Sequence, residues 1–415
     1  MTTKSSPRNI EQKEVSLLYL FFTFLKVGTV SFGGNMALIS VVKNVMVDRD
    51  KTLKNEMVLE AVSIGSLLPG PLAVNVVAYI GYTLKKSLGA IVSMVAILLP
   101  AVMLMLVISW LYFRFGVNQR FNGVLLYITG AVAAIILATA LQLYSQGLRG
   151  SWVKSSLAVV GAIGVVLSNS FSFTLLLIVA GGLAGWWLKL HGAGGAVNNK
   201  AVSPVFTKTK VRTMGTIVAW VALGGLLLLF VSRAYSYTSI ILLKIVFIFS
   251  GISLSLFGGG YVMIPIMQSL FVTELHWLTR QEFIDAIAFS QLTPGPILVS
   301  ATFIGYKLYG FAGALLATVS IFAPSALLMI LVSRIYSIIS HLQYVRHILT
   351  GVKSVVIGLI AGAAIKIGMH VQWNVSLALV TTASFVMLYF YKISPVYIIL
   401  VCAIIGMLLW YFNFG

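Results

Sequence analysis

The chain has 415 residues, a net charge of +19 at pH 7 and a mean hydropathy of +1.03, with 60% apolar and only 9% charged residues. A soluble protein of this length could not hide so much apolar surface, so a polytopic membrane protein is expected. The single cysteine, Cys402, excludes an intrachain disulfide and a cysteine-rich metal site.

The excess of Lys and Arg is scattered over short loops, which argues against nucleic-acid binding. It fits the basic cytoplasmic loops of membrane proteins and their attraction to anionic lipid. The acids favour an anionic substrate as well. All nine lie at residues 11–14, 48–60 and 274–285, whereas a cation carrier usually needs carboxylates along its pathway.

Apolar runs of about 20 residues predict membrane segments in chain order. The first six are expected near 17–46, 57–84, 88–112, 122–145, 152–168 and 171–190. A basic linker follows at 191–212, and one additional apolar run occupies 213–232. The last six are expected near 236–272, 282–308, 311–333, 346–366, 374–391 and 395–412.

The sequence contains an internal duplication. Pro69-Gly70-Pro71 recurs as Pro294-Gly295-Pro296 at a shift of 225 residues (294 minus 69), and the same shift carries Phe32-Gly33-Gly34 onto Phe257-Gly258-Gly259. After a one-residue slip, Gly81-Tyr82 corresponds to Gly305-Tyr306. We therefore expect a first repeat at 1–190, the linker with one extra transmembrane helix at 191–234, and a second repeat at 235–415.

The expected fold is all-α, with two homologous halves and about 13 membrane segments that include broken helices. An odd extra segment between two six-segment copies makes the halves an inverted repeat and puts the basic N-terminus and linker on the cytoplasmic side. If each Pro-Gly-Pro segment is re-entrant instead, the count is eleven and the linker falls outside.

Each Pro-Gly-Pro predicts a helix, a break and a second helix, because proline ends one helix and suits the first position of the next. The new helices would begin at Pro71 and Pro296. Their free N–H groups and positive dipole ends form a site for an oxyanion. Asn75 and Ser300 lie one turn further and could donate side-chain hydrogen bonds. A plain proline kink is the alternative.

A second break is expected at the glycines that follow Gly28 and at Gly258-Gly259-Gly260, because the first apolar run is longer than a bilayer core. Close helix packing through small residues is an equal alternative.

Charged residues inside predicted segments are candidates for function. Lys26 lies deep in the first segment and is predicted to lie on the anion path, whereas Lys353 is expected to snorkel to the interface. Glu60 and Asp285 occupy the same repeat position and are candidate coupling residues, for instance as proton sites; helix-start acids are the alternative. No metal ligand spacing, nucleotide-binding glycine loop or nucleophile–base pair is found, so no metal, cofactor or enzymatic activity is expected.

At these motifs the chain resembles the chromate ion transporter family in its two-domain form. The resemblance rests on Phe24 to Gly34, Leu68 to Asn75 and Tyr79 to Tyr82, and on Leu256 to Gly260, Gln291 to Pro296 and Phe303 to Tyr306. It implies chromate efflux across the cytoplasmic membrane by gradient-driven exchange, with sulfate as a look-alike. Many members have proline after Phe-Gly-Gly, where this chain has Asn35 and Gly260.

The predicted substrate-binding residues come from both copies. They are Lys26, Ser31, Gly33, Gly34, Asn35, Pro69, Gly70, Pro71, Asn75, Gly258, Gly259, Gly260, Gln291, Thr293, Pro294, Gly295, Pro296 and Ser300. The expected partners are a small inorganic oxyanion and the lipid bilayer, with a homodimer left open. The alternatives are an exporter of an amino acid or cationic drug that uses Glu60 or Asp285, and a membrane enzyme or scaffold without flux.

Overall fold

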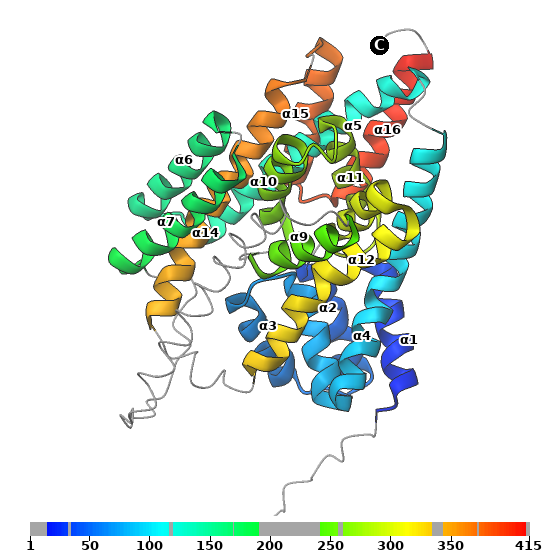
Figure 1. Ribbon diagram of the computed structural model, residues 1–415, viewed down its shortest axis with the longest axis vertical. Coiled ribbons are helices and arrows are strands. Elements are labelled where there is room, and N and C mark those ends of the chain that lie inside the picture. The colour runs from blue at the N-terminus through cyan, green and yellow to red at the C-terminus, as the bar shows by residue number, and fades with distance from the viewer. Residues whose placement is uncertain are drawn as a thin grey trace, which may run out of the picture.

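The computed structural model describes residues 15–31, 35–115, 119–168, 170–190, 241–255, 260–333, 343–371 and 373–411. Every regular element in these ranges is a helix (Figure 1). The predicted all-α fold is therefore confirmed for the described part of the chain. The basic linker and the additional apolar run, both predicted within 191–234, lie outside the described residues.

The two copies have the same order of helices, and the second contains two additional 3-10 turns. The first consists of α1 (Leu17–Val30), α2 (Asn35–Val42), the π-helix η1 (Lys43–Arg49), α3 (Asn55–Leu67), α4 (Leu72–Phe115), α5 (Gln119–Gly147), α6 (Trp152–Leu167) and α7 (Phe171–Trp187). The second consists of α9 (Ile241–Ser255), the 3-10 turn η2 (Gly260–Val262), α10 (Met263–Met267), the π-helix η3 (Gln268–Glu274), α11 (Arg280–Leu292), the 3-10 turn η4 (Ile297–Val299), α12 (Ser300–Ser333), α14 (Gln343–Met369), α15 (Val375–Tyr389) and α16 (Pro395–Tyr411).

Each Pro-Gly-Pro segment is the tip of a helical hairpin. In the second copy, Lys307 of α12 forms an ion pair with Glu282 at the start of α11, although a straight run would separate them by about 38 Å. Phe289 and Phe303, nearer the tip, have ring centroids 5.9 Å apart. In the first copy, a Cβ on Gly65 of α3 would lie within 3.6 Å of Val76 of α4. The structure thus corrects the expected straight passage through 57–84 and 282–308 and favours the folded-back alternative.

The chain also reverses between α1 and η1 and between α9 and η3. The Tyr19 hydroxyl, near the start of α1, donates to Asp50 Oδ2 at 2.7 Å, just after η1 ends. In the second copy, Phe249 of α9 and Phe271 of η3 have centroids 5.2 Å apart. Since both ends of each segment meet, the chain reverses near the breaks. Each copy therefore begins with two consecutive hairpins.

A third reversal lies inside α4 and α12. The backbone leaves helical geometry at Lys85 and Lys86 and again at Tyr309 and Gly310. A Cβ on Gly81 would lie 2.4 Å from the carbonyl oxygen of Gly89, and the corresponding distance from Gly305 to Gly313 is 2.2 Å. Only glycine permits so close an approach, which explains why these residues recur in both copies.

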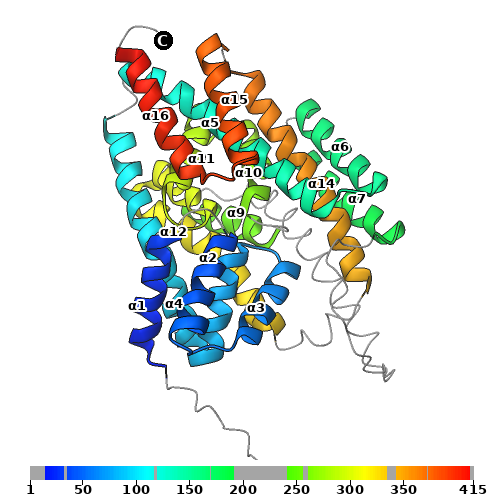
Figure 2. The ribbon, with the colours of Figure 1, turned by 180° about the vertical axis from the view of Figure 1, so that it is seen from behind.

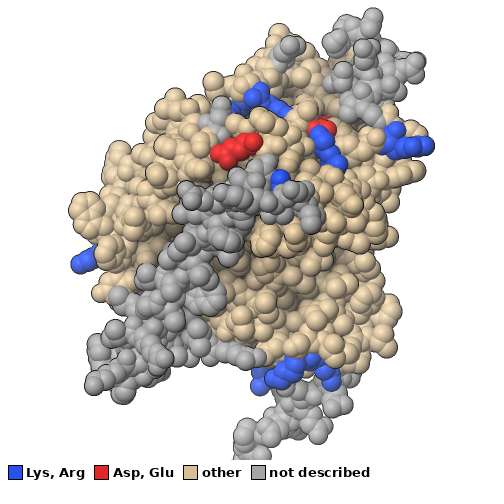
Figure 3. All heavy atoms as spheres, in the orientation of Figure 1, with Lys and Arg blue, Asp and Glu red and all other residues tan. Residues whose placement is uncertain are grey.

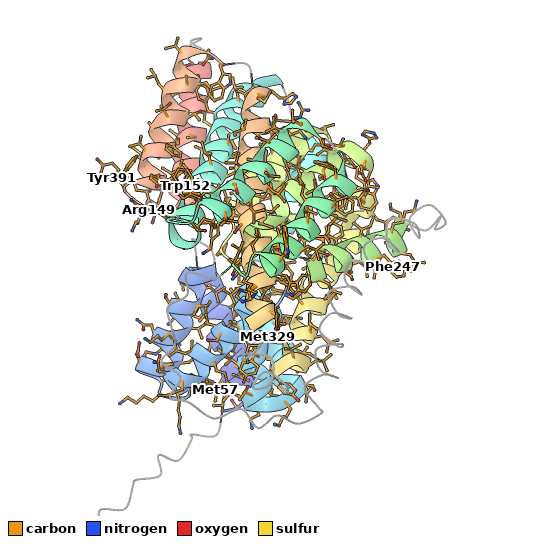
Figure 4. All side chains as sticks on the ribbon, turned by 90° about the vertical axis from the view of Figure 1, so that its left-hand side faces the viewer. Met57, Arg149, Trp152, Phe247, Met329 and Tyr391 are labelled. Carbon is orange, nitrogen blue, oxygen red and sulfur yellow. The ribbon has the colours of Figure 1, made fainter. Side chains whose placement is uncertain are left out.

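From these turns the second part of α4 runs toward the top of Figure 1 and that of α12 toward the bottom, as the reverse view also shows (Figure 2). The lower part of α12 reaches the first hairpins, where Met329 Sδ lies 3.5 Å from a Cβ position on Gly65 (Figure 4).

The two copies interlock rather than lie side by side. α14 of the second copy packs against α6 and α7 of the first, and α5 of the first packs against α15 and α16 of the second. Small residues bring the backbones together: a Cβ on Gly358 would lie 1.8 Å from the carbonyl oxygen of Ala158. The contacts are reciprocal, as in a twofold arrangement of like units.

Within the described ranges, four helical stretches have the length and apolar composition to cross a membrane: Leu72–Phe115, Leu125–Gly147, Ile297–Ser333 and His347–Met369. Large apolar side chains such as Leu88, Leu183 and Leu400 are exposed on the outer surface, as expected for contact with lipid. In Figure 3 most charged atoms lie toward the upper part and the lower end of the face shown, and the surface between them is largely uncharged.

Candidate functional site at the crossed hairpin tips

The hairpin tips of the two copies touch each other. The amide of Gly295 donates to the carbonyl oxygen of Ser31 at 3.0 Å, which joins the second Pro-Gly-Pro to the first glycine-rich tip. In the second copy, a Cβ on Gly260 would lie 2.6 Å from Ile297 Cγ2, so the two tips of that copy also adjoin. The breaks predicted in separate parts of the sequence are therefore neighbours in space.

Each Pro-Gly-Pro also packs against the other copy. A Cβ on Gly70 would lie 2.2 Å from Ser325 Cβ of α12, and one on Gly295 would lie 3.3 Å from Ala101 Cβ of α4. Ser325 and Ala101 occupy one repeat position, directly after the prolines inside the two helices. Gly70 has φ 108 and Gly295 φ 123, a conformation that L side chains rarely adopt. At Gly70, both the close contact with Ser325 and the positive φ require glycine.

The helices after the tips begin one residue later than predicted. α4 starts at Leu72, and the amide of Asn75 bonds the carbonyl oxygen of Pro71 at 3.0 Å. In the second copy η4 starts at Ile297 and α12 only at Ser300. The first amides of a helix have no intrahelical acceptor. The amides of residues 72–74 therefore point toward the tip, where an anion could accept from them.

Two side chains at the same repeat position carry buried polar atoms without a partner. Asn75 is 0% exposed; its Nδ2 donates to the carbonyl oxygen of Pro69 at 3.2 Å, but its Oδ1 accepts nothing. Ser300 is also 0% exposed, and its Oγ has no partner. Unsatisfied buried polar atoms are uncommon in folded proteins and indicate a missing ligand, ion or water. The free hydroxyl of Ser300 can donate to an anion and supports its sequence-based choice; the unpaired atom of Asn75 is an acceptor, and only the second N–H of its amide could donate.

The other predicted tip residues are used within the fold. Ser31 Oγ donates to the carbonyl oxygen of Val27 at 2.6 Å, and Thr293 Oγ1 donates to that of Ser290 at 3.0 Å. Gln291 Nε2 donates to the Tyr261 hydroxyl at 3.0 Å. These bonds hold the tips in shape.

The structure does not describe five of the predicted site residues or their side chains. Gly33, Gly34, Gly258 and Gly259 lie outside the described residues, and the side chain of Asn35, at the start of α2, is likewise outside them.

The structure does not bring Lys26 to the buried tips. Its side chain is exposed, and its carbonyl oxygen accepts from Thr29 Oγ1 at 2.8 Å. Lys26 lies near the end of the 14-residue helix α1, on the outer surface. Its predicted place on the anion path stays a prediction.

Lys353 is a residue that the sequence analysis assigned to snorkelling. α14 begins at Gln343, so Lys353 lies about 15 Å into the helix. Gly351 and Gly358 face α6 and α7, and Lys353 lies on the opposite side of α14, beside the buried Leu349, Ile357 and Ile360. Lys353 is only partly exposed, and no hydrogen bond or ion pair joins it to another described residue. The sequence analysis expected this segment to begin near residue 346, but α14 begins at Gln343, which places Lys353 deeper in the helix than expected.

The two candidate coupling acids have different surroundings. Asp285 is 0% exposed and accepts from the Tyr112 hydroxyl at 2.7 Å and from Gln281 Nε2 at 2.9 Å. Glu60, at the same repeat position, is exposed. α11 begins with a capping box between Thr279 and Glu282, which fixes the turn that precedes Asp285.

Comparisons with known proteins agree with the duplicated architecture. The family model described as chromate transporter matches residues 18–186 and again residues 243–407. A chromate transport protein of Cupriavidus metallidurans is 28% identical over 94% of this chain and 93% of its own length. A probable chromate transport protein of Synechococcus elongatus is 26% identical over 95% of this chain and 96% of its own length.

A shorter relative matches a single copy. An uncharacterized transporter of Bacillus subtilis is 26% identical over 40% of this chain but 94% of its own length. No solved structure matches this chain. Because the family model covers both copies and most of the sequence, this chain belongs to the chromate transporter family.

Proposed function

We propose that this membrane transporter moves chromate, or another tetrahedral oxyanion such as sulfate, across the cytoplasmic membrane by gradient-driven exchange that results in chromate efflux. The names of the two-copy relatives support chromate as the substrate. Those names give no support to an exporter of amino acids or cationic drugs.

The observation that carries the proposal is that buried polar atoms are left unpaired one turn after each Pro-Gly-Pro, where each tip packs against a helix of the other copy. Amides of residues 72–74 and the hydroxyl of Ser300 are donors that a dianion accepts from. Hydrogen bonds to charged groups contribute about 1.5–3 kcal/mol each, more than neutral ones. An oxyanion held at both tips would offset its lost hydration in this way.

A formal positive charge would strengthen the site. At an effective dielectric constant near 20, two unit charges 4 Å apart attract by about 4 kcal/mol. We propose Lys353, on the core-facing side of α14, as the main cation, and Lys26 as a contributor from the outer surface. α14 also packs against η2 and α10, which follow the second glycine-rich tip.

We further propose that the halves form an inverted repeat and that transport rocks the two sets of hairpins about the shared site. The reciprocal packing of α5 and α14 and the opposite courses of α4 and α12 support this arrangement. The number of membrane crossings and a homodimer stay predictions.

The test uses the purified protein in proteoliposomes loaded with chromate or sulfate. We expect rapid exchange of labelled external chromate, competition by sulfate, and no flux of labelled amino acids. Pro71→Ala and Pro296→Ala should each lower exchange at least tenfold, with the lipid-facing Leu400→Ala as the matched control. Absence of oxyanion flux from a folded wild-type protein would contradict the proposal.

A further inference from the structure

The buried carboxylate of Asp285 joins the two copies. It lies on α11 of the second copy, and its closest donor, the Tyr112 hydroxyl, belongs to α4 of the first. Gln281 Nε2, which also approaches Asp285, lies 3.4 Å from Thr129 Oγ1 of α5. The rings of Phe289 and Phe303 flank Tyr112 at centroid distances of 5.7 and 5.1 Å. Asp285 therefore lies where α11, α4 and α5 meet, and it accepts from a tyrosine that belongs to an aromatic cluster.

No cation neutralises Asp285 within the described part of the chain. The two ion pairs found there join Arg49 to Asp50 and Lys307 to Glu282. Removing an ionised carboxylate from water costs several kcal/mol unless it is paired, even when neutral donors approach it. A bound proton removes that cost.

The charged and titratable groups around Asp285 come from every packed element. α4 contributes Tyr112 and the exposed Arg114. α12 contributes Lys307, which pairs with Glu282 of α11, and α11 itself begins at the exposed Arg280. η3 ends at Glu274, which accepts from the Phe171 amide at 2.6 Å. η4 and α16 contain no charged residue, and α5 contributes Thr129, whose Oγ1 lies 3.4 Å from Gln281 Nε2. Asp285 is thus the acid that the α11–α5–α4 junction encloses.

The corresponding acid of the first copy has different surroundings. Glu60 holds the position that corresponds to Asp285, but it is exposed. α11 packs against α5 and α16, whereas α3 makes no comparable contact with α14 or α7 among the described residues. The acid at this repeat position is therefore enclosed by the other copy at Asp285 and exposed at Glu60.

We propose that Asp285 is the proton-binding site that couples a proton gradient to anion transport. A proton delivered as hydronium adds to a carboxylate oxygen of Asp285 and releases water when the hairpin docks, and it passes back to a water molecule as hydronium when the hairpin separates from α4 and α5. Docking then requires one proton, and the Tyr112–Asp285 bond forms and breaks once in each cycle. The inference rests on the proposed transport function and names its coupling ion.

The experiment measures labelled chromate flux and intravesicular pH in the same proteoliposomes, with and without an imposed pH gradient. In the wild type, a gradient of one pH unit should change net chromate flux about tenfold, and chromate movement should shift the internal pH. Asp285→Asn keeps an acceptor for Tyr112 but no longer titrates. It should lose both effects while chromate–chromate exchange at equal pH stays within about threefold of wild type.

Two further variants separate coupling from structure. Glu60→Gln removes the exposed acid at the same repeat position of the first hairpin; it is the matched control and should keep the response to a pH gradient. Tyr112→Phe should keep coupling but move the pH midpoint of flux upward, because the carboxylate loses a donor that favours its ionised form.

An Asp285→Asn variant that still follows the pH gradient like the wild type overturns the inference. So does wild-type chromate flux that is indifferent to pH. An absence of any oxyanion flux in the wild type would instead overturn the proposed function itself, so the two failures are distinguishable.

Discussion

The α3–α4 and α11–α12 hairpins are built from the same motif but lie in different surroundings. Both reverse at Pro-Gly-Pro and pack that tip against a helix of the other copy. α11 is held by a capping box, an ion pair and the bond from Tyr112, whereas in α3 the corresponding acid, Glu60, is exposed. A duplicated sequence thus supplies two equivalent parts that one chain holds in unequal states. For a carrier, that inequality is what an alternating cycle needs.

The largest expected difference between the hairpins concerns the tip glycines. Gly70→Ala places a Cβ against Ser325 Cβ and forces a positive φ, so we expect a loss of several kcal/mol and of nearly all flux. Gly295→Ala meets only Ala101 at 3.3 Å and should cost about 1–2 kcal/mol. Thermal unfolding in detergent measures both. Adding Ser325→Gly to Gly70→Ala should recover part of the loss; equal stability of the two single variants would contradict the asymmetry.

The two lysines offer the next largest contrast. Lys353→Gln removes a partly buried charge and should lower chromate flux at least tenfold, since attraction between charges is strong away from water. Lys26→Gln removes an exposed charge, and we expect less than a threefold change that disappears at high salt. Flux measured at low and high ionic strength tests both. A larger loss for Lys26→Gln would restore it as the main cation.

The unpaired polar side chains beside the tips should contribute about equally. Ser300→Ala removes one hydroxyl donor and should raise the half-saturating chromate concentration about three- to tenfold, the effect of one lost hydrogen bond of about 1 kcal/mol. Asn75→Ala should do the same, because it removes the second N–H of the amide, and it also frees the carbonyl oxygen of Pro69. Thr381→Ala, which removes another buried unpaired hydroxyl on α15, is the matched control. Unchanged saturation curves for both tip variants would argue against direct contact with the anion.

The smallest effect should come from the ion pair at the base of the second hairpin. Lys307 and Glu282 have no counterpart in the first copy, where Thr83 and Met57 stand at those positions. Because the pair is partly exposed, Lys307→Gln should lower stability by at most about 1 kcal/mol. Hydrogen exchange should quicken in α11 and stay unchanged in α3. Equal acceleration in both hairpins would mean that the pair does not act locally.

The sequence by itself determined the class of the protein, its duplication and the position of the breaks. Apolar content far above that of a soluble protein requires a membrane, and two matching Pro-Gly-Pro motifs require two matching interruptions because proline cannot continue a helix. Asn75 and Ser300 followed from the same repeat. These conclusions are local or compositional, so a single chain is enough to reach them.

Only the tertiary structure decided that the interrupted segments fold back and that each tip meets the opposite copy. Helix breaks leave the direction of the next helix open, and packing decides it: close approach at Gly81 and Gly305 and contacts such as Lys307–Glu282 fix the reversals. The same packing leaves Lys26 outside, turns Lys353 inward and encloses Asp285 but not Glu60. Burial depends on neighbours that are distant along the chain, and a repeat in sequence cannot reveal where its two copies differ in environment.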